Sequence, residues 1–148
     1  MAAGSERATE LRRALAATWP YLLSHHRVEE RHRCHRVRAG GREVAVCARC
    51  SGVYPGIAAG ICLFVFGVAS GLWAPLIALG PAPALADWAV TTFTDRRGHN
   101  AVRTATGGLL GLAYGVALPW VLTTATMWPV AVAVGYGTTA AVGLRLSW

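Results

Sequence analysis

Three cysteines lie in the polar first third of the chain, directly before a long uncharged segment. They are Cys34, Cys47 and Cys50, and thiolates at such spacings favour a soft, tetrahedral ion such as zinc. The pattern predicts a structural zinc site with a histidine as its fourth ligand. Four histidines of this region are candidates: His25, His26, His32 and His35.

Other chemistry at the thiols stays open. The metal could be catalytic, the Cys-x2-Cys from Cys47 to Cys50 could be a redox pair, or the thiols could simply stay reduced. A stable disulfide between Cys34 and Cys47 is not expected in the cytoplasm. We expect three neighbouring arginines to lower the pKa values of the thiols: Arg33, Arg36 and Arg49.

The segment between Cys34 and Cys47 predicts a β-hairpin. Its residues alternate about Gly40 and Gly41, as they do around a two-residue hairpin loop. If these glycines form the loop, Cys34 lies opposite Cys47, and Cys50 follows in a turn, so the three thiols converge at the base of the hairpin. The other predicted pairs are Ala39 with Arg42, Arg38 with Glu43, and Val37 with Val44.

The residues before the hairpin predict an amphipathic helix. From Ser5 to Leu23, apolar residues recur at helical spacing opposite arginines, which is typical of a helix in the membrane interface. Residues 1–50 are therefore predicted to form a cytoplasmic region with this helix and the Cys/His hairpin.

Two uncharged segments, 50–86 and 104–144, predict the fold of the remainder. A helix of roughly forty residues would be about 60 Å long, twice the thickness of the bilayer core, so each segment must turn back. The expected turns are Trp73–Pro75 and Met127–Pro129, where proline stops a helix and tryptophan prefers the interface. The prediction is an all-α membrane protein, with a four-helix transmembrane bundle over 51–148 and spans near 53–73, 75–94, 105–126 and 129–146.

The arginines predict the orientation of this bundle. Ten of the fourteen precede the first predicted span, three lie between the second and third spans, and one ends the fourth. All fall on one side, and cytoplasmic loops carry the positive excess, so both termini are predicted to be cytoplasmic at the cell membrane. Orientation and anionic lipid headgroups explain the net charge of +7, and nucleic acid is not an expected partner.

Asp87 is a candidate catalytic residue because a carboxylate within a span costs about 2.5 to 3.5 kcal/mol and marks a functional site by default. Gly80, Pro81 and Pro83 are expected to break the helix before it. Arg103 could reach back toward Asp87, and a structural ion pair between spans is the alternative. The following loop offers candidate anion ligands: Arg96, Arg97, Asn100 and Arg103.

Glycines at every fourth position of the third predicted span, Gly107, Gly111 and Gly115, form a ladder that permits close helix packing. Gly56 and Gly60 form a shorter one on the first span. Packing within one bundle is expected, and a homodimer is the alternative.

Two blocks of the chain resemble a known family. Cys-His-Arg at Cys34–Arg36 and Cys-Ala-Arg-Cys-Ser-Gly-Val-Tyr at Cys47–Tyr54 are similar to motifs of the small predicted membrane proteins of domain-of-unknown-function family 2085. The likeness covers most of Ser24 to Gly111. A second block contains Asp87, Arg96, Asn100, Arg103 and Thr106–Gly107, but has Trp88 and Thr91 where a glycine and a glutamine are expected.

This resemblance implies no reaction, but it makes His35 a candidate ligand beside His26. Side chains alternate along a strand, so His35 is expected to point away from Cys34, whereas His32 shares its face and ranks third.

Three functions remain open, and the sequence does not decide whether the chain is an enzyme. The leading hypothesis is a structural or interaction module at the membrane surface, with a protein partner or lipid. The alternatives are an enzyme acting on a lipid or isoprenoid phosphate through Asp87, and a small transporter or metal-handling protein.

Overall fold

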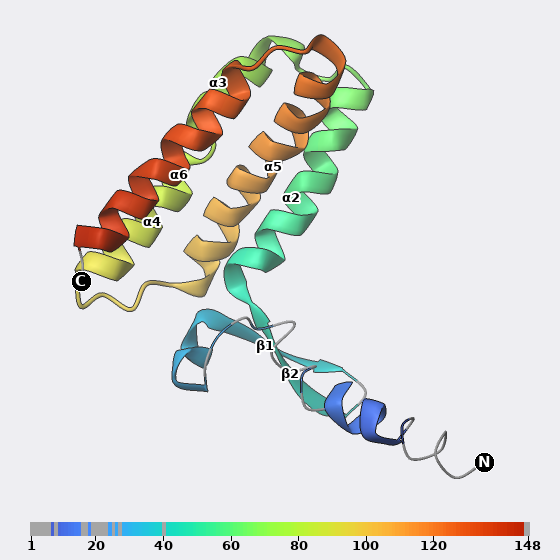
Figure 1. Ribbon diagram of the computed structural model, residues 1–148, viewed down its shortest axis with the longest axis vertical. Coiled ribbons are helices and arrows are strands. Elements are labelled where there is room, and N and C mark those ends of the chain that lie inside the picture. Colours follow the sequence, from blue (N-terminus) through green and yellow to red (C-terminus); the bar gives the residue numbers. More distant parts are fainter. Residues whose placement is uncertain are drawn as a thin grey trace. The chain divides into compact units, whose positions relative to one another are not determined.

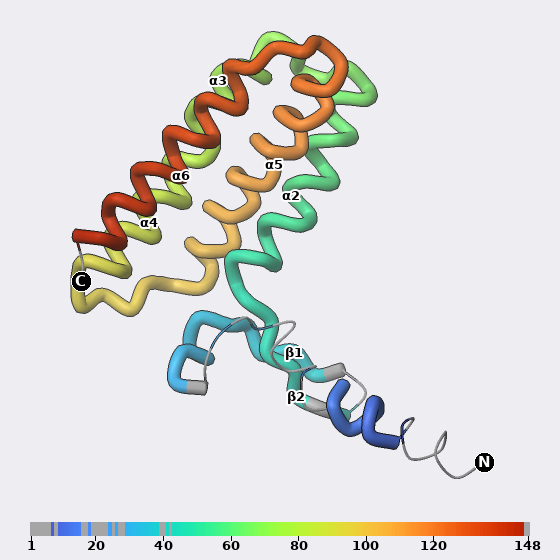
Figure 2. Tube along the Cα trace, viewed as in Figure 1, coloured from blue at the N-terminus to red at the C-terminus, as the bar shows by residue number. Residues whose placement is uncertain are grey.

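The computed structural model describes residues 7, 9–15, 18, 24, 26, 28–39 and 41–146 (Figures 1 and 2). The chain forms two compact units, Met1–Cys47 and Ala48–Trp148, which we call unit 1 and unit 2. Their boundary lies three residues before the one expected at residue 50.

Unit 1 contains helical residues, a short 3-10 helix and a β-hairpin. Residues 7, 9–15 and 18 are helical, in agreement with the predicted N-terminal helix. The 3-10 helix η1 (Val28–Arg33) precedes strands β1 (Cys34–Ala39) and β2 (Arg42–Cys47). The strands are antiparallel with Cys34 opposite Cys47 and Val37 opposite Val44, so the predicted register is confirmed. Gly41 has a φ of 77°, which a glycine adopts readily in the tight turn.

Unit 2 consists of helices that are long and apolar enough to cross a membrane. The four candidate spans are Ala48–Val65, Ser70–Phe93, Asn100–Thr124 and Trp128–Leu146. The second combines three consecutive helices, and the others are single helices. In chain order, the elements are α2 (Ala48–Val65), η2 (Ser70–Leu72), α3 (Trp73–Leu79), α4 (Ala82–Phe93), α5 (Asn100–Thr124) and α6 (Trp128–Leu146).

The predicted end of the first span at Trp73 is wrong, because α2 ends at Val65 and the chain turns over residues 66–69. Gly67 and Ala69 take left-handed conformations there, with φ of 66° and 53°. Pro75 lies in the first turn of α3, where proline sacrifices no intrahelical hydrogen bond. Trp73 therefore begins a helix instead of ending one, and the first span also begins five residues earlier than predicted, at Ala48.

The other predicted breaks agree with the structure. The chain leaves the helical conformation over residues 125–127 before α6 begins at Trp128. The second span is interrupted between Leu79 and Ala82, at Gly80 and Pro81.

Backbone contact between α2 and α5 is the main packing of unit 2, and Figure 1 shows these helices side by side. A methyl group added at Gly111 of α5 would lie 2.2 Å from the carbonyl oxygen of Val53, and one at Gly56 of α2 would lie 2.4 Å from that of Gly108. Gly107 and Gly115 face α2 equally closely. The glycine ladder thus packs within the chain.

A small apolar cluster of unit 2 is centred on Val116, the residue that follows the last glycine of the ladder. Val116 is fully buried and packs with Ile77 and Ala117. Aromatic side chains surround this cluster, and Trp120 makes edge contacts with both Trp73 and Trp128. The tryptophans expected at a membrane interface therefore also join three of the four spans.

Candidate functional site

The base of the hairpin in unit 1 brings two of the predicted metal ligands together. Cys34 and Cys47 are cross-strand partners, and both are buried, with 5% and 6% of their surface exposed. The Cys34 thiol donates a long hydrogen bond of 3.9 Å to the carbonyl oxygen of Ser24, which is also buried. Ser24 therefore lies against this end of the hairpin.

Among the described histidines, His26 lies beside the Cys47 thiol. Its Nε2 lies 3.5 Å from the Cys47 Sγ, and its Nδ1 lies 3.4 Å from a carboxylate oxygen of Glu30. His32 is exposed, and its Nδ1 lies 3.3 Å from the Glu29 carbonyl oxygen. His35 lies next to Cys34 in β1, opposite Val46, where strand alternation directs neighbouring side chains to different faces. His25 lies outside the described residues.

The donors do not form a finished metal site. Among the described residues, no group of three or more His, Cys, Asp or Glu side chains is arranged to hold a metal ion. Cys50 lies in the first turn of α2, in unit 2, so its role as a ligand rests on the sequence spacing alone. The zinc site stays a prediction.

The expected lowering of the thiol pKa values is wrong for Cys34. Burial raises the pKa of this thiol above its ordinary value, and the neighbouring Cys47 raises it further. Arg31 opposes these effects, and Glu30 adds to them. Burial at this position therefore favours the protonated thiol over the thiolate, which is the form that reacts and that binds metals.

Asp87 forms an ion pair in unit 2 with a residue that the sequence analysis did not assign to it. Arg49, in the first turn of α2, donates a hydrogen bond of 2.5 Å to the Asp87 carboxylate on α4. The Asp87 side chain is only 7% exposed and that of Arg49 is 29% exposed. In the sequence, Arg49 is the last charged residue before the uncharged segment, and only this position could have suggested it as a partner of Asp87.

Arg103, the expected partner of Asp87, supports the loop before α5. It is 4% exposed and donates hydrogen bonds to the carbonyl oxygen of Arg97 and to Asn100 Oδ1. Gly98, with a φ of 66°, approaches Arg103 so closely that an added methyl group would lie 3.1 Å from its Nη2. Arg96 and Arg97 are exposed. The four candidate anion ligands therefore divide into two exposed cations, a buried arginine that supports the loop, and Asn100, which accepts a hydrogen bond from that arginine.

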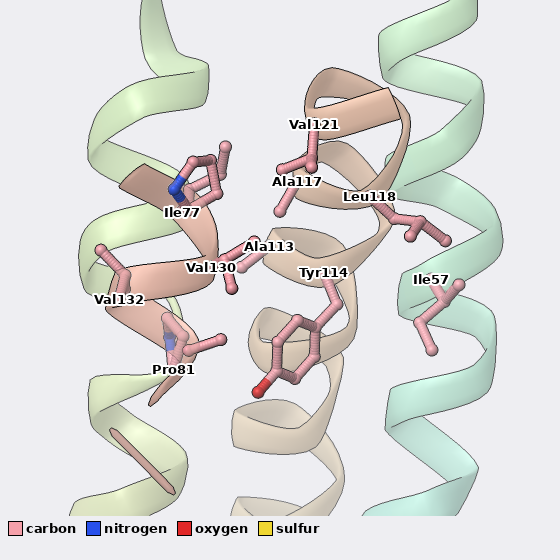
Figure 3. A pocket seen from close by; sticks show the side chains of 12 residues that line it. Ile57, Ile77, Pro81, Ala113, Tyr114, Ala117, Leu118, Val121, Val130 and Val132 are labelled. Carbon is pink, nitrogen blue, oxygen red and sulfur yellow. The ribbon is translucent and has the colours of Figure 1, made fainter. Parts of the chain in front are cut away.

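An apolar cavity of about 380 Å³ lies elsewhere in unit 2. Figure 3 shows Ile57, Ile77, Ala113, Tyr114 and Val130 among its lining residues, which come from four helices. Tyr114 supplies the only hydroxyl group of the lining, and neither Asp87 nor Arg103 belongs to it. This cavity does not connect the candidate carboxylate with the candidate anion ligands.

The model of a family described as predicted membrane protein (DUF2085) matches residues 30–117 of the chain. The matched range includes the hairpin, the ion pair between Arg49 and Asp87, and the glycine ladder of α5. No curated protein and no solved structure is detectably similar to the chain.

Proposed function

The chain belongs to the DUF2085 family of predicted membrane proteins. We propose that it is a multi-pass membrane protein with a cytoplasmic zinc-binding module. In this proposal, unit 2 is the membrane anchor and unit 1 is a structural or interaction module. One observation carries the proposal: among the residues of unit 1 that the structure describes, two buried thiols and an imidazole come together at the base of the hairpin.

The arginines of unit 2 support the cytoplasmic assignment. They occur in the first turn of α2, in the loop before α5, in the first turn of α5 and in the last turn of α6. In a bundle of four antiparallel spans, these positions share one end. The turns at residues 66–69 and 125–127 contain no charged residue. Because positive residues are retained in the cytoplasm, both termini are proposed to lie there, in the cell membrane.

The composition of the interior of unit 1 supports a metal. Its buried residues, among those that the structure describes, are Ser24, Cys34 and Cys47. The described residues of unit 1 bury no large apolar side chain and so gain little from the hydrophobic effect, and small domains usually depend on metals or disulfides. Zinc bound by thiolates supplies folding free energy directly.

The donor set fits zinc in its chemistry. Cys34, Cys47 and His26 are two thiols and an imidazole, and the spacing of Cys50 offers a third thiolate. Because these donors are protein side chains sufficient for a closed four-coordinate site, the role assigned to the metal is structural.

The contacts of Asp87 favour a module over an enzyme. The carboxylate that would act as general acid or base is buried in an ion pair with Arg49, and Arg103 is engaged with its own loop. Arg31, Arg36 and Arg38 of unit 1 are exposed, and they give the module a basic surface for an acidic protein segment or for anionic lipid headgroups.

Elemental analysis of the full-length protein in detergent tests the proposal. We expect about one zinc ion per chain in the wild type and its loss in Cys47→Ser. Cys62→Ser is the matched control, because Cys62 is exposed on α2 and should leave the metal content unchanged. A well-folded wild type without metal would overturn the proposal.

A further inference from the structure

Glu30 contacts Nδ1 of His26, the ring nitrogen that does not face the Cys47 thiol. Glu30 lies in η1, four residues after His26, and its Oε2 is 3.4 Å from Nδ1 of the imidazole. The other ring nitrogen, Nε2, is the one 3.5 Å from the Cys47 Sγ. The carboxylate and the thiol therefore lie at the two nitrogens of the same ring.

This arrangement has a defined consequence for the imidazole. A neutral imidazole carries its proton on one nitrogen and a lone pair on the other, and the hydrogen bond made by one nitrogen decides which. A carboxylate accepts a proton-bearing Nδ1, so Nε2 is left with its lone pair directed toward Cys47. Metal-binding histidines commonly donate their second N–H to a carboxylate in this way.

We propose that Glu30 is a positioning residue that holds His26 as an Nε2 ligand of the zinc ion; this inference rests on the proposed zinc site. The Glu30 carboxylate is itself held at two points. Its Oε1 lies 3.5 Å from Nη1 of Arg33, while Oε2 faces the imidazole. Glu30 thus selects His26 over His35 as the histidine of the site.

The neighbouring residues provide matched comparisons. Glu29 is also in η1 and carries the same charge as Glu30. Its contact with a histidine uses the backbone, because His32 lies against the Glu29 carbonyl oxygen and not against the carboxylate. His35 has the same chemistry as His26 but is in a strand, adjacent to Cys34. A variant of Glu29 therefore tests whether charge alone matters, and a variant of His35 tests whether any nearby histidine would serve.

The experiment measures metal affinity in the full-length protein in detergent. Cobalt(II) replaces zinc, its absorption reports tetrahedral thiolate coordination, and competition with a chelator gives the affinity. Glu30→Gln is expected to weaken binding by about 10- to 100-fold, the usual effect of removing a partner of a metal ligand. His26→Ala should weaken it at least as much, while Glu29→Gln and His35→Ala should stay within about twofold of the wild type.

Two further measurements separate positioning from a purely structural role. Arg33→Gln removes the other ion pair of Glu30, so equal weakening by Arg33→Gln and Glu30→Gln would overturn the inference in favour of a folding effect. Nitrogen NMR of the zinc-bound protein should show His26 bound through Nε2 with its proton on Nδ1, whereas Glu30→Gln should also show a population in which the imidazole is released from the metal or binds it through Nδ1.

The failure of this inference differs from the failure of the proposed function. A wild type that binds neither zinc nor cobalt would overturn both, and would leave a simple hydrogen bond between Cys47 and His26. A wild type that binds the metal, with Glu30→Gln unchanged or with His35→Ala weakened more than His26→Ala, would overturn the role of Glu30 alone.

Discussion

The two units of the chain are built on opposite principles. In unit 2 the closest contacts join backbone to backbone, because glycines of α2 and α5 face each other without side chains between them. In unit 1 the described interior consists of two cysteines and a serine. Unit 1 therefore buries polar and soft donor atoms, whereas unit 2 packs backbone directly against backbone.

This difference reflects the solvent proposed for each unit. Lipid is as apolar as leucine, so helices in a membrane gain little by burying large apolar side chains and associate through close van der Waals contact. A small polar unit in water lacks the apolar area to form a core and needs a cross-link.

The largest effect is expected for Gly111→Ala. The added methyl group would lie 2.2 Å from the carbonyl oxygen of Val53, and backbone cannot move aside as a side chain can. The helices must separate, and we expect a loss of about 3 kcal/mol or more, at the upper end of overpacking effects. Thermal or chemical unfolding of the purified protein in detergent measures this loss.

Gly108→Ala is the matched control on the same helix. Its nearest foreign atom is the Gly52 carbonyl oxygen at 3.9 Å, which is ordinary contact. Because alanine favours a helix over glycine by about 1 kcal/mol, this variant should be neutral or slightly more stable. Equal destabilisation by the two substitutions would mean that α2 and α5 do not pack through this face.

The next effect is expected for Asp87→Ala, which leaves the Arg49 guanidinium without its partner. Removing one member of a buried ion pair costs about 3 to 5 kcal/mol, and the partial exposure of Arg49 places this case near the lower value. The double variant Arg49→Met with Asp87→Leu should recover much of the loss, because no uncompensated charge remains. Unfolding of the wild type, Asp87→Leu, Arg49→Met and the double variant gives the coupling, and additive losses would contradict a direct pair.

A smaller effect is expected for Tyr136→Phe. The hydroxyl group of Tyr136 on α6 donates a hydrogen bond of 2.8 Å to the carbonyl oxygen of Ala78, just before the break in the second span. Its loss should cost about 1 kcal/mol, which the same unfolding assay can measure. Tyr54→Phe, at an exposed position of α2, should have a smaller effect, and the reverse order would count against this contact.

The sequence predicted those features that arise from local periodicity. Alternation around two adjacent glycines predicted the register from Cys34 to Cys47, and uncharged length predicted four spans. It mislocated the first turn because Trp73 and Pro75 suggested a helix end, whereas the left-handed residues Gly67 and Ala69 form the turn.

The missed parts of the candidate site depend on contacts between distant segments. Arg49 and Asp87 are 38 residues apart and meet only when α2 and α4 pack in one bundle. His26 reaches Cys47 from a segment outside the hairpin, so strand alternation could not rank it above His35. The local sequence pattern around a residue does not predict which residue of another element its side chain will contact.

Amide hydrogen exchange of the full-length protein in detergent, with and without a strong chelator, tests the central contrast most directly. We predict that removing the metal abolishes the protection of the strand amides in β1 and β2, while the amides of α2 and α5 keep theirs. The control is Cys47→Ser, which should resemble the chelated protein without treatment. Strands that stay equally protected in all three samples would contradict the account, because unit 1 would then be held together without a metal.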